Sequence, residues 1–244
     1  AGGLVIAELV GMEGSGRDGG VAAVAAVEEV RRIPFAGPRW DVAVACGSLK
    51  GGRADWLVEK CSELGAASLI PTLTERSNSV GGSSQDKKGA RKKGKDDGDD
   101  DDTERSGREG RWERVAAASA KQCLRRHRLA VRPPTNVTQL CEAVRRAPVA
   151  LLCAAGAPPL REVMCSADTR MGDDVDAGYY GEDGGGVLIV GPEGDFTPEE
   201  VELLVAAGAR PVGLGPLRLR VETAAVAIMS CVSMTHPRTQ PPGC

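Results

Sequence analysis

The chain has 244 residues, of which 41% are hydrophobic and only 3% aromatic. This length suits one α/β domain and part of another, with a core built mainly from Ala, Val and Leu. No apolar stretch approaches the ~20 residues of a membrane span, so no membrane partner is expected. The eight cysteines include no C-x-x-C pair, which favours buried thiols in a reducing compartment and no metal site.

The net charge of −3 argues against a nucleic-acid-binding protein only if the charges are evenly mixed, and they are not. Acidic residues are concentrated at positions 96–102. Positive charge is concentrated at positions 111–132, where seven Lys or Arg residues accompany a single acid, Glu113. Because local charge decides whether phosphates can be held, the second segment remains a candidate RNA surface.

The N-terminal part predicts short β segments at residues 4–10 and 21–29, joined by a glycine-rich turn at 11–20. The second segment is also compatible with a short helix. Residues 34–38 are expected to form a linker. Ala1 stands within a stretch that already resembles a strand, so we expect a preceding segment to be missing.

From Trp40 onward, apolar strands alternate with helices. Strands are predicted at residues 42–46, 67–70 (ended by Pro71), 149–153, 187–190 and 212–214, and helices at 53–64, 111–126, 201–207 and 222–234. This alternation predicts a mostly parallel sheet covered by helices on both faces. Two segments interrupt it, a low-complexity insertion at 79–110 that is too polar to fold and a Gly- and Asp-rich loop at 166–186.

Two glycine loops follow buried strands near the C-terminus. The first continues into Thr197-Pro198-Glu199-Glu200, which predicts a capping box at a helix start. The second leads from the 212–214 strand into a helix of small residues. Each loop alone is compatible with a simple βα turn, since neither matches a dinucleotide fingerprint or a P-loop. Together they predict a narrow, backbone-lined pocket that suits an adenosine group, at the carboxyl ends of parallel strands.

These segments resemble the ribosomal RNA small subunit methyltransferase E family, the 16S rRNA uracil-N3 methyltransferases. The family pattern G-P-E-G-G is matched by Gly191-Pro192-Glu193-Gly194-Asp195, and its L-G and L-R-x-E-T-A by Leu214-Gly215 and Leu219-Arg220-Val221-Glu222-Thr223-Ala224. Further matches are Lys50 to Gly65, then Pro71 and Glu75-Arg76-Ser77, and Lys121-Gln122-Cys123-Leu124-Arg125. Asp195 and Leu124 depart from the pattern, since family members have Gly at the first position and many have it at the second. Asp tolerates a left-handed backbone better than most residues, so the turn is expected to survive.

The resemblance implies a SPOUT fold at residues 39–240, with a parallel sheet, helices on both faces and a C-terminal trefoil knot, an exception to unknotted topology. It also implies a homodimer and a preceding PUA-like RNA-binding β-barrel, of which residues 1–38 would be a remnant. S-adenosylmethionine (SAM) would be bound in the knot. The implied cofactor-binding residues are Ile189, Val190, Gly191, Pro192, Glu193, Gly194, Leu214, Gly215, Leu219, Arg220, Thr223 and Ala224.

Arg220 and Glu222 are the leading catalytic candidates, because a guanidinium can stabilise charge that develops on uracil oxygens. The alternative is that the two residues pair with each other and brace the knot. The RNA-binding candidates are Arg76, Lys121, Arg125 and Arg128. Arg76 is equally compatible with pairing to Glu75, and the other three with a solvated helix face.

The expected function is SAM-dependent methylation of uridine N3 in small-subunit rRNA, a step in rRNA processing and ribosome biogenesis. The alternatives are a non-catalytic RNA-binding ribosome-assembly factor that kept the knotted fold and, with less support, a SPOUT enzyme acting on tRNA ribose. The family implies a cytoplasmic location. The insertions and the Lys121-Gln122-Cys123 variant favour a eukaryotic member, in a chloroplast or mitochondrion.

Overall fold

The structure is a computed structural model that describes residues 2–4, 7–13, 21–26, 31–33, 35, 37–45, 52–77, 100–168 and 184–234. Its centre is a seven-stranded sheet in the order β11-β9-β10-β5-β6-β7, with β8 also paired to β6. All pairings in this sheet are parallel, as predicted. Its strands are β5 (Arg39–Ala45), β6 (Ser68–Leu73), β7 (Ala130–Val131), β8 (Thr135–Asn136), β9 (Val149–Cys153), β10 (Gly185–Val190) and β11 (Arg210–Val212).

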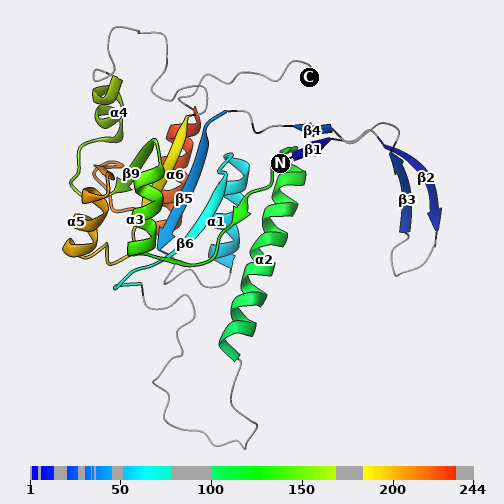
Figure 1. Ribbon diagram of the computed structural model, residues 1–244, viewed down its shortest axis with the longest axis horizontal. Helices are drawn as coiled ribbons and strands as arrows, with labels where there is room; N and C mark the ends of the chain where they lie inside the picture. Colours follow the sequence, from blue (N-terminus) through cyan, green and yellow to red (C-terminus); the bar gives the residue numbers. More distant parts are fainter. Residues whose placement is uncertain are drawn as a thin grey trace, which may run out of the picture.

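Helices cover both faces of the sheet (Figure 1). They are α1 (Gly52–Glu63), α2 (Asp100–Gln122), α3 (Val137–Arg146), α4 (Leu160–Asp168), α5 (Pro198–Ala206) and α6 (Val221–Met234). Residues of α1, α2, α4 and α6 pack on one face in one hydrophobic cluster. Residues of α3 and α5 form a second cluster on the other face. The described helices include none that is both long and apolar enough to cross a membrane.

Strand β10 shows how the two faces are built. All of its residues are buried, and they alternate between the clusters: Leu188 and Val190 face α1 and α6, whereas Val187 and Ile189 face α3 and α5. A strand buried on both sides needs a continuous apolar run, which residues 187–190 provide. This alternation decides which side chains of β10 can reach the functional site.

Several boundaries differ from the prediction. Pro71 does not end β6, because it lies between the residues that pair with β7 and those that pair with β8, where no ladder N–H is needed. The predicted loop at 166–186 overlaps both α4 and β10, and α3 was not predicted at all. Gly185 and Gly186 belong to β10, and both positions require glycine because a Cβ on either would lie within 2.2 Å of a neighbouring strand's carbonyl oxygen.

Helix α2 begins at Asp100, so the end of the segment predicted to be unfolded is helical. Three consecutive aspartates stand at this end, where the helix dipole favours negative charge. Positions 78–99, with most of the predicted insertion, lie outside the described residues.

The N-terminal segments form two small antiparallel pairs. Strand β2 (Ala7–Glu13) pairs with β3 (Val21–Ala26), as the predicted β segments required, and β1 (Gly2–Leu4) pairs with β4 (Arg31–Ile33). Residues 21–26 thus form a strand rather than a helix, and the rest of that predicted segment lies outside the described residues. A PUA-like barrel remnant and the trefoil knot both stay predictions.

Candidate active site

A cavity of about 590 Å³ lies at the carboxyl ends of three adjacent parallel strands, β9, β10 and β11. Cys153, Val190 and Val212, the last residues of these strands, all line it. The loops that follow the strands complete the lining, and the start of α6 contributes Val221 and Ala224. The position is the one expected for ligands in open parallel sheets.

Both predicted glycine loops line this cavity. Eight of the twelve predicted cofactor-binding residues do so: Val190, Gly191, Pro192, Glu193, Leu214, Gly215, Leu219 and Ala224. The other four, Ile189, Gly194, Arg220 and Thr223, are not among the lining residues. Ile189 points to the α3 and α5 side of the sheet. Thr223 is exposed, because the face of α6 that lines the cavity carries Val221 and Ala224, three positions apart, and Thr223 lies on another face.

A third loop, at residues 154–159, was missed by the sequence reasoning. It lines the cavity with Ala154, Ala155, Gly156, Ala157 and Pro159. It is joined to the end of β11, because Gly213 N donates to Pro158 O at 2.8 Å and a Cβ on Gly213 would lie 2.5 Å from Ala157 O. The available signal was a run of small residues directly after a buried strand, the same signal that identified the other two loops.

The first glycine loop (residues 191–196) is held in shape by its own turn and by the helix that follows. Asp195 has φ +60° and its N–H donates to Pro192 O at 2.9 Å, so the left-handed turn survives the Gly-to-Asp change, as predicted. At the start of α5 the predicted capping box is present, with reciprocal hydrogen bonds between Thr197 and Glu200.

The turn at residues 74–77 supports this loop from outside the cavity. Arg76 donates to the carbonyl oxygens of Gly194 (2.8 Å) and Phe196 (3.4 Å), and Glu75 N donates to Glu200 Oε1 at 2.9 Å. Arg76 therefore pairs with the loop backbone rather than with Glu75. Gly194 faces Arg76, since a Cβ there would lie 3.5 Å from the Arg76 Cδ.

Glu222 pairs with Arg53, not with Arg220. Arg53 Nε donates to Glu222 Oε1 at 2.9 Å and Nη2 donates to Oε2 at 2.8 Å, while Nη2 also lies 3.5 Å from Glu193 Oε1. The Arg53 hydrogen bonds lower the pKa of Glu222, against the opposing effect of burial, with a smaller contribution from the charge of Arg220. The predicted brace between Arg220 and Glu222 is thus wrong, and Arg53 was missed.

Two further arginines belong to the segment that carries the second glycine loop into α6. Arg220 is exposed, and in the described ranges its guanidinium makes no hydrogen bond or ion pair. Arg218 lines the cavity, donates to Glu193 O and lies 3.9 Å from Asp195 Oδ2, so it connects the two glycine loops. Asp195 therefore gives the first loop a carboxylate that the family glycine cannot supply.

The predicted basic helix face is only partly present. Helix α2 ends at Gln122, and Leu124 has φ +55°, so the chain leaves the helix before Arg125. Arg125 turns inward and donates to the carbonyls of Ser62, Gly65 and Ala66. It stabilises the C-terminal end of α1, where a cation is favoured, instead of facing solvent. Lys121 and Arg128 are exposed, and so is Arg126.

The described residues contain no cluster of three His, Cys, Asp or Glu side chains that could hold a metal ion. Cys153, which lines the cavity, is a free thiol whose pKa is raised to about 12 by burial. It is therefore protonated near neutral pH and contributes to the cavity as a small apolar group.

Comparison with known proteins agrees with this geometry. The model of the RNA methyltransferase domain family matches residues 37–94 and 99–233. Ribosomal RNA small subunit methyltransferase E of Bacillus subtilis is 30% identical over 206 residues, 84% of this chain and 68% of that protein. The protein of the same name from Synechocystis sp. is 26% identical over 210 residues, 85% of this chain and 56% of that protein. The chain thus spans little more than half to two thirds of these relatives.

A solved structure shares the fold. The ribosomal RNA small subunit methyltransferase E of Neisseria gonorrhoeae, bound to S-adenosyl methionine, superposes with a TM-score of 0.62 at 21% identity, over 96% of this chain and 79% of that one. At 21% identity this likeness shows a shared fold only. The family is shown by the family-model match and by the Bacillus relative. The chain belongs to the ribosomal RNA small subunit methyltransferase E family.

Proposed function

We propose that the chain binds SAM in the cavity and transfers its methyl group to N3 of a uridine in small-subunit, 16S-type rRNA. The observation that carries this proposal is the cavity formed by three loops at the carboxyl ends of β9, β10 and β11. Family membership adds support, as does the relative from Neisseria gonorrhoeae, which is bound to S-adenosyl methionine.

The lining fits such a cofactor in size and chemistry. A volume of about 590 Å³ is within the range of small-molecule sites. Small side chains leave main-chain N–H and C=O groups available to an adenine edge, while Glu193, Asp195 and Arg218 supply both charges for an amino-acid moiety. When bound, SAM would supply an electrophilic methyl group on its sulfonium.

Arg220 is proposed to act on the substrate. It stands between the cavity-lining residues Leu219 and Val221 and is exposed, so its guanidinium is available to the uracil oxygens as N3 loses its proton. Glu222 is poorly suited to accept that proton, because both of its oxygens accept hydrogen bonds from Arg53 and its pKa is lowered. Its proposed role is to hold the start of α6.

The assembly and location follow from the family resemblance and are part of the proposal. The chain would act as a homodimer on small-subunit rRNA, in the cytoplasm or in an organelle with bacterial-type ribosomes. Sedimentation of the protein would test the dimer.

Ala155 offers a direct test of the cavity assignment. It is exposed and lines the cavity, so Ala155→Leu should occupy ligand space without disturbing the core. We expect calorimetry to show SAM affinity lowered at least ~10-fold, a loss of about 1.4 kcal/mol. The matched control is Ala118→Leu, at an exposed alanine of α2 away from the cavity. Equal SAM affinity in both variants would contradict the assignment.

The reaction is tested by incubating the protein with SAM and unmodified small ribosomal subunits, then digesting the rRNA for mass spectrometry of nucleosides. We expect N3-methyluridine. Subunit binding without any methylated nucleoside would favour the assembly-factor alternative, and a ribose-methylated nucleoside would place the chain with a different SPOUT activity.

A further inference from the structure

Three charged side chains from distant parts of the sequence meet beside the cavity. Arg53 lies in the first turn of α1, Glu222 in the first turn of α6, and Glu193 in the first glycine loop. Arg53 and Glu222 form a two-pronged pair at 2.9 and 2.8 Å, and Glu193 lies 3.5 Å from the same guanidinium. One arginine therefore contacts both α6, which Arg220 directly precedes, and a loop that lines the cavity.

The position of Arg53 is unfavourable for its own helix. A cation in the first turn opposes the helix dipole, whereas Glu222 is favourably placed in the first turn of α6. The pair is also not needed to join these helices, since buried side chains of both, including Leu57, Cys61 and Ile228, share one cluster. The side chain of Arg53 is 39% exposed and that of Glu222 10%, so solvent still reaches the arginine and reduces what the pair contributes to stability. A role in the site explains its position better than a role in folding.

We propose that Arg53 is a positioning residue for methyl transfer. It fixes the carboxylate of Glu222 at the start of α6, so that Arg220, which lies between the lining residues Leu219 and Val221, is held beside the cavity, and it couples α6 to the first glycine loop through Glu193. This inference rests on the proposed function. The planar fork of the guanidinium is essential to it, because Nε and Nη2 each donate to a separate Glu222 oxygen, whereas a lysine ammonium offers a single nitrogen.

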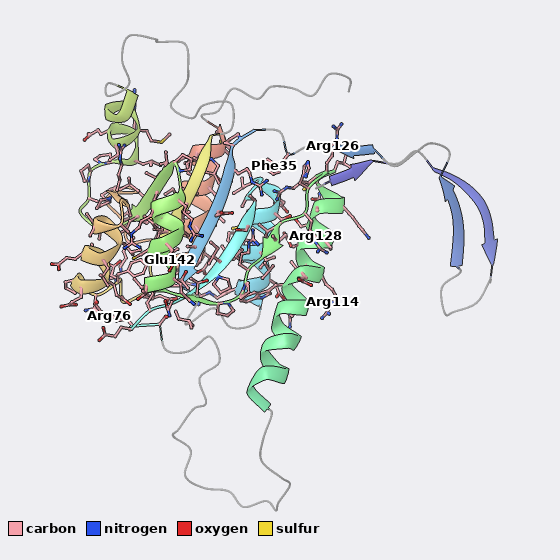
Figure 2. All side chains as sticks on the ribbon, in the orientation of Figure 1. Phe35, Arg76, Arg114, Arg126, Arg128 and Glu142 are labelled. Carbon is pink, nitrogen blue, oxygen red and sulfur yellow. The ribbon has the colours of Figure 1, made fainter. Side chains whose placement is uncertain are left out.

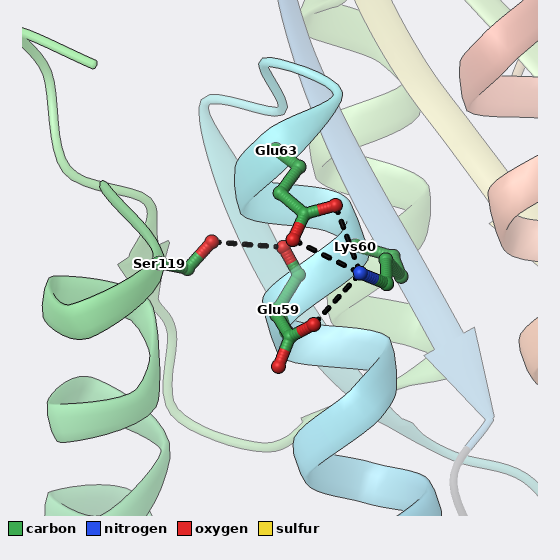
Figure 3. A network of polar contacts seen from close by, with 4 residues as sticks. All are labelled: Glu59, Lys60, Glu63 and Ser119. Atoms are coloured by element: carbon green, nitrogen blue, oxygen red, sulfur yellow. Dashed lines mark hydrogen bonds and ion pairs between the residues drawn. The ribbon is translucent and has the colours of Figure 1, made fainter. Parts of the chain in front are cut away.

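The chain contains a matched control on the same helix. Lys60 of α1 also contacts two carboxylates, Glu59 at 2.7 Å and Glu63 at 2.9 Å (Figure 3). Both acids belong to α1 itself, and none of the three residues lines the cavity. Lys60→Gln therefore removes a doubly paired cation from α1 without touching the site.

The first measurement does not require activity. The Glu222 carboxyl is titrated by NMR in protein labelled with ¹³C at glutamate Cδ, with the signal assigned through Glu222→Gln. We expect Arg53→Gln to raise the Glu222 pKa, because the largest cause of its lowering is lost and burial then acts with less opposition. Lys60→Gln should leave it unchanged. A Glu222 pKa that is the same in wild type and Arg53→Gln would overturn the proposal.

The second measurement is steady-state methylation. We expect Arg53→Gln to lower kcat roughly 10- to 100-fold, as small misplacements of a catalytic group do, and to change the SAM Kd much less. The acid limb of its pH–rate profile should move to higher pH. Arg53→Lys should recover only part of kcat, and adding Glu222→Gln to Arg53→Gln should cause little further loss.

The outcomes separate this inference from the function on which it rests. Wild-type protein that methylates no ribosomal substrate would contradict the proposed function. The NMR titration would still decide whether Arg53 controls the ionisation of the Glu222 carboxylate. Active wild type together with an unchanged kcat in folded Arg53→Gln would overturn the positioning role. An equal loss of kcat in Lys60→Gln would do the same, because it would assign the effect to α1 as a whole.

Discussion

Leu124 and Asp195 both adopt the left-handed backbone conformation, with φ of +55° and +60°. The family pattern has glycine at the position of Asp195, and many members have it at that of Leu124; glycine adopts this conformation without steric cost. Asp195 belongs to a residue type that tolerates it comparatively well, and its carboxylate lies 3.9 Å from Arg218. Leu124 is 88% exposed, so nothing packed around its side chain offsets the strain.

Leu124→Gly should therefore stabilise the protein. Removing the strained Cβ contact outweighs the added freedom of the unfolded chain, and we expect a gain of about 0.5–1 kcal/mol in the free energy of unfolding. Urea denaturation measures it. Leu124→Ala is the control, because alanine keeps the Cβ and should bring no comparable gain. A destabilised Leu124→Gly variant would show that the leucine side chain makes a stabilising contact.

At the scale of elements, the turn at residues 74–77 and the first glycine loop act as one unit. The turn follows β6 and the loop follows β10, strands that both flank β5. Arg76 fixes the loop through two carbonyl oxygens although it does not line the cavity. A residue outside the cavity can thus control the shape of its wall.

Arg76→Ala should weaken SAM binding without unfolding the protein. The loop loses its outer hydrogen bonds and samples more conformations, so we expect the SAM Kd to rise roughly 3- to 10-fold, about 0.6–1.4 kcal/mol. Calorimetry tests this, with the exposed Arg145 of α3 changed to Ala as control. An unchanged SAM Kd combined with weaker RNA binding would instead support the RNA contact that the sequence suggested for Arg76.

At the scale of the whole molecule, charge is distributed unevenly. Figure 2 shows Arg114, Arg126 and Arg128 along α2 and the segment that follows it. Near them Arg39 lies over the Phe35 ring at 5.1 Å, and Phe35 contacts His127. The exposed cations form a surface that can attract phosphates despite a net charge of −3.

Replacing Lys121, Arg126 and Arg128 together by Ala should weaken RNA binding and reduce its salt dependence. Each lost phosphate contact lowers the slope of log K against log salt by about 0.7–0.9. SAM affinity should stay unchanged. Arg125→Ala should instead lower the unfolding temperature and leave the salt slope of RNA binding unaltered, because Arg125 donates its hydrogen bonds to carbonyls at the end of α1. An unaltered slope in the triple variant would identify a merely solvated surface.

The sequence by itself determined what depends on local pattern. The apolar run at 187–190 predicts a buried strand, and Thr197 with Glu200 predicts the helix start, because strand burial and capping involve neighbouring residues. Two of the three cavity loops were recognised in the same way. Local pattern did not predict α3 or α4. It also failed at Pro71, because a proline fits within β6 only where β7 and β8 leave a gap in their pairing with that strand.

Only the tertiary structure decided which side chains meet. Arg53 and Glu222 are 169 positions apart, and no spacing rule connects them. Arg125 is of a residue type that commonly binds phosphates, yet the left-handed turn at Leu124 directs its side chain to the end of α1. Ile189 and Val190 are neighbours in one motif, yet strand alternation places only Val190 at the cavity. Pairing partners and facing directions arise from packing of distant segments, which a linear pattern does not encode.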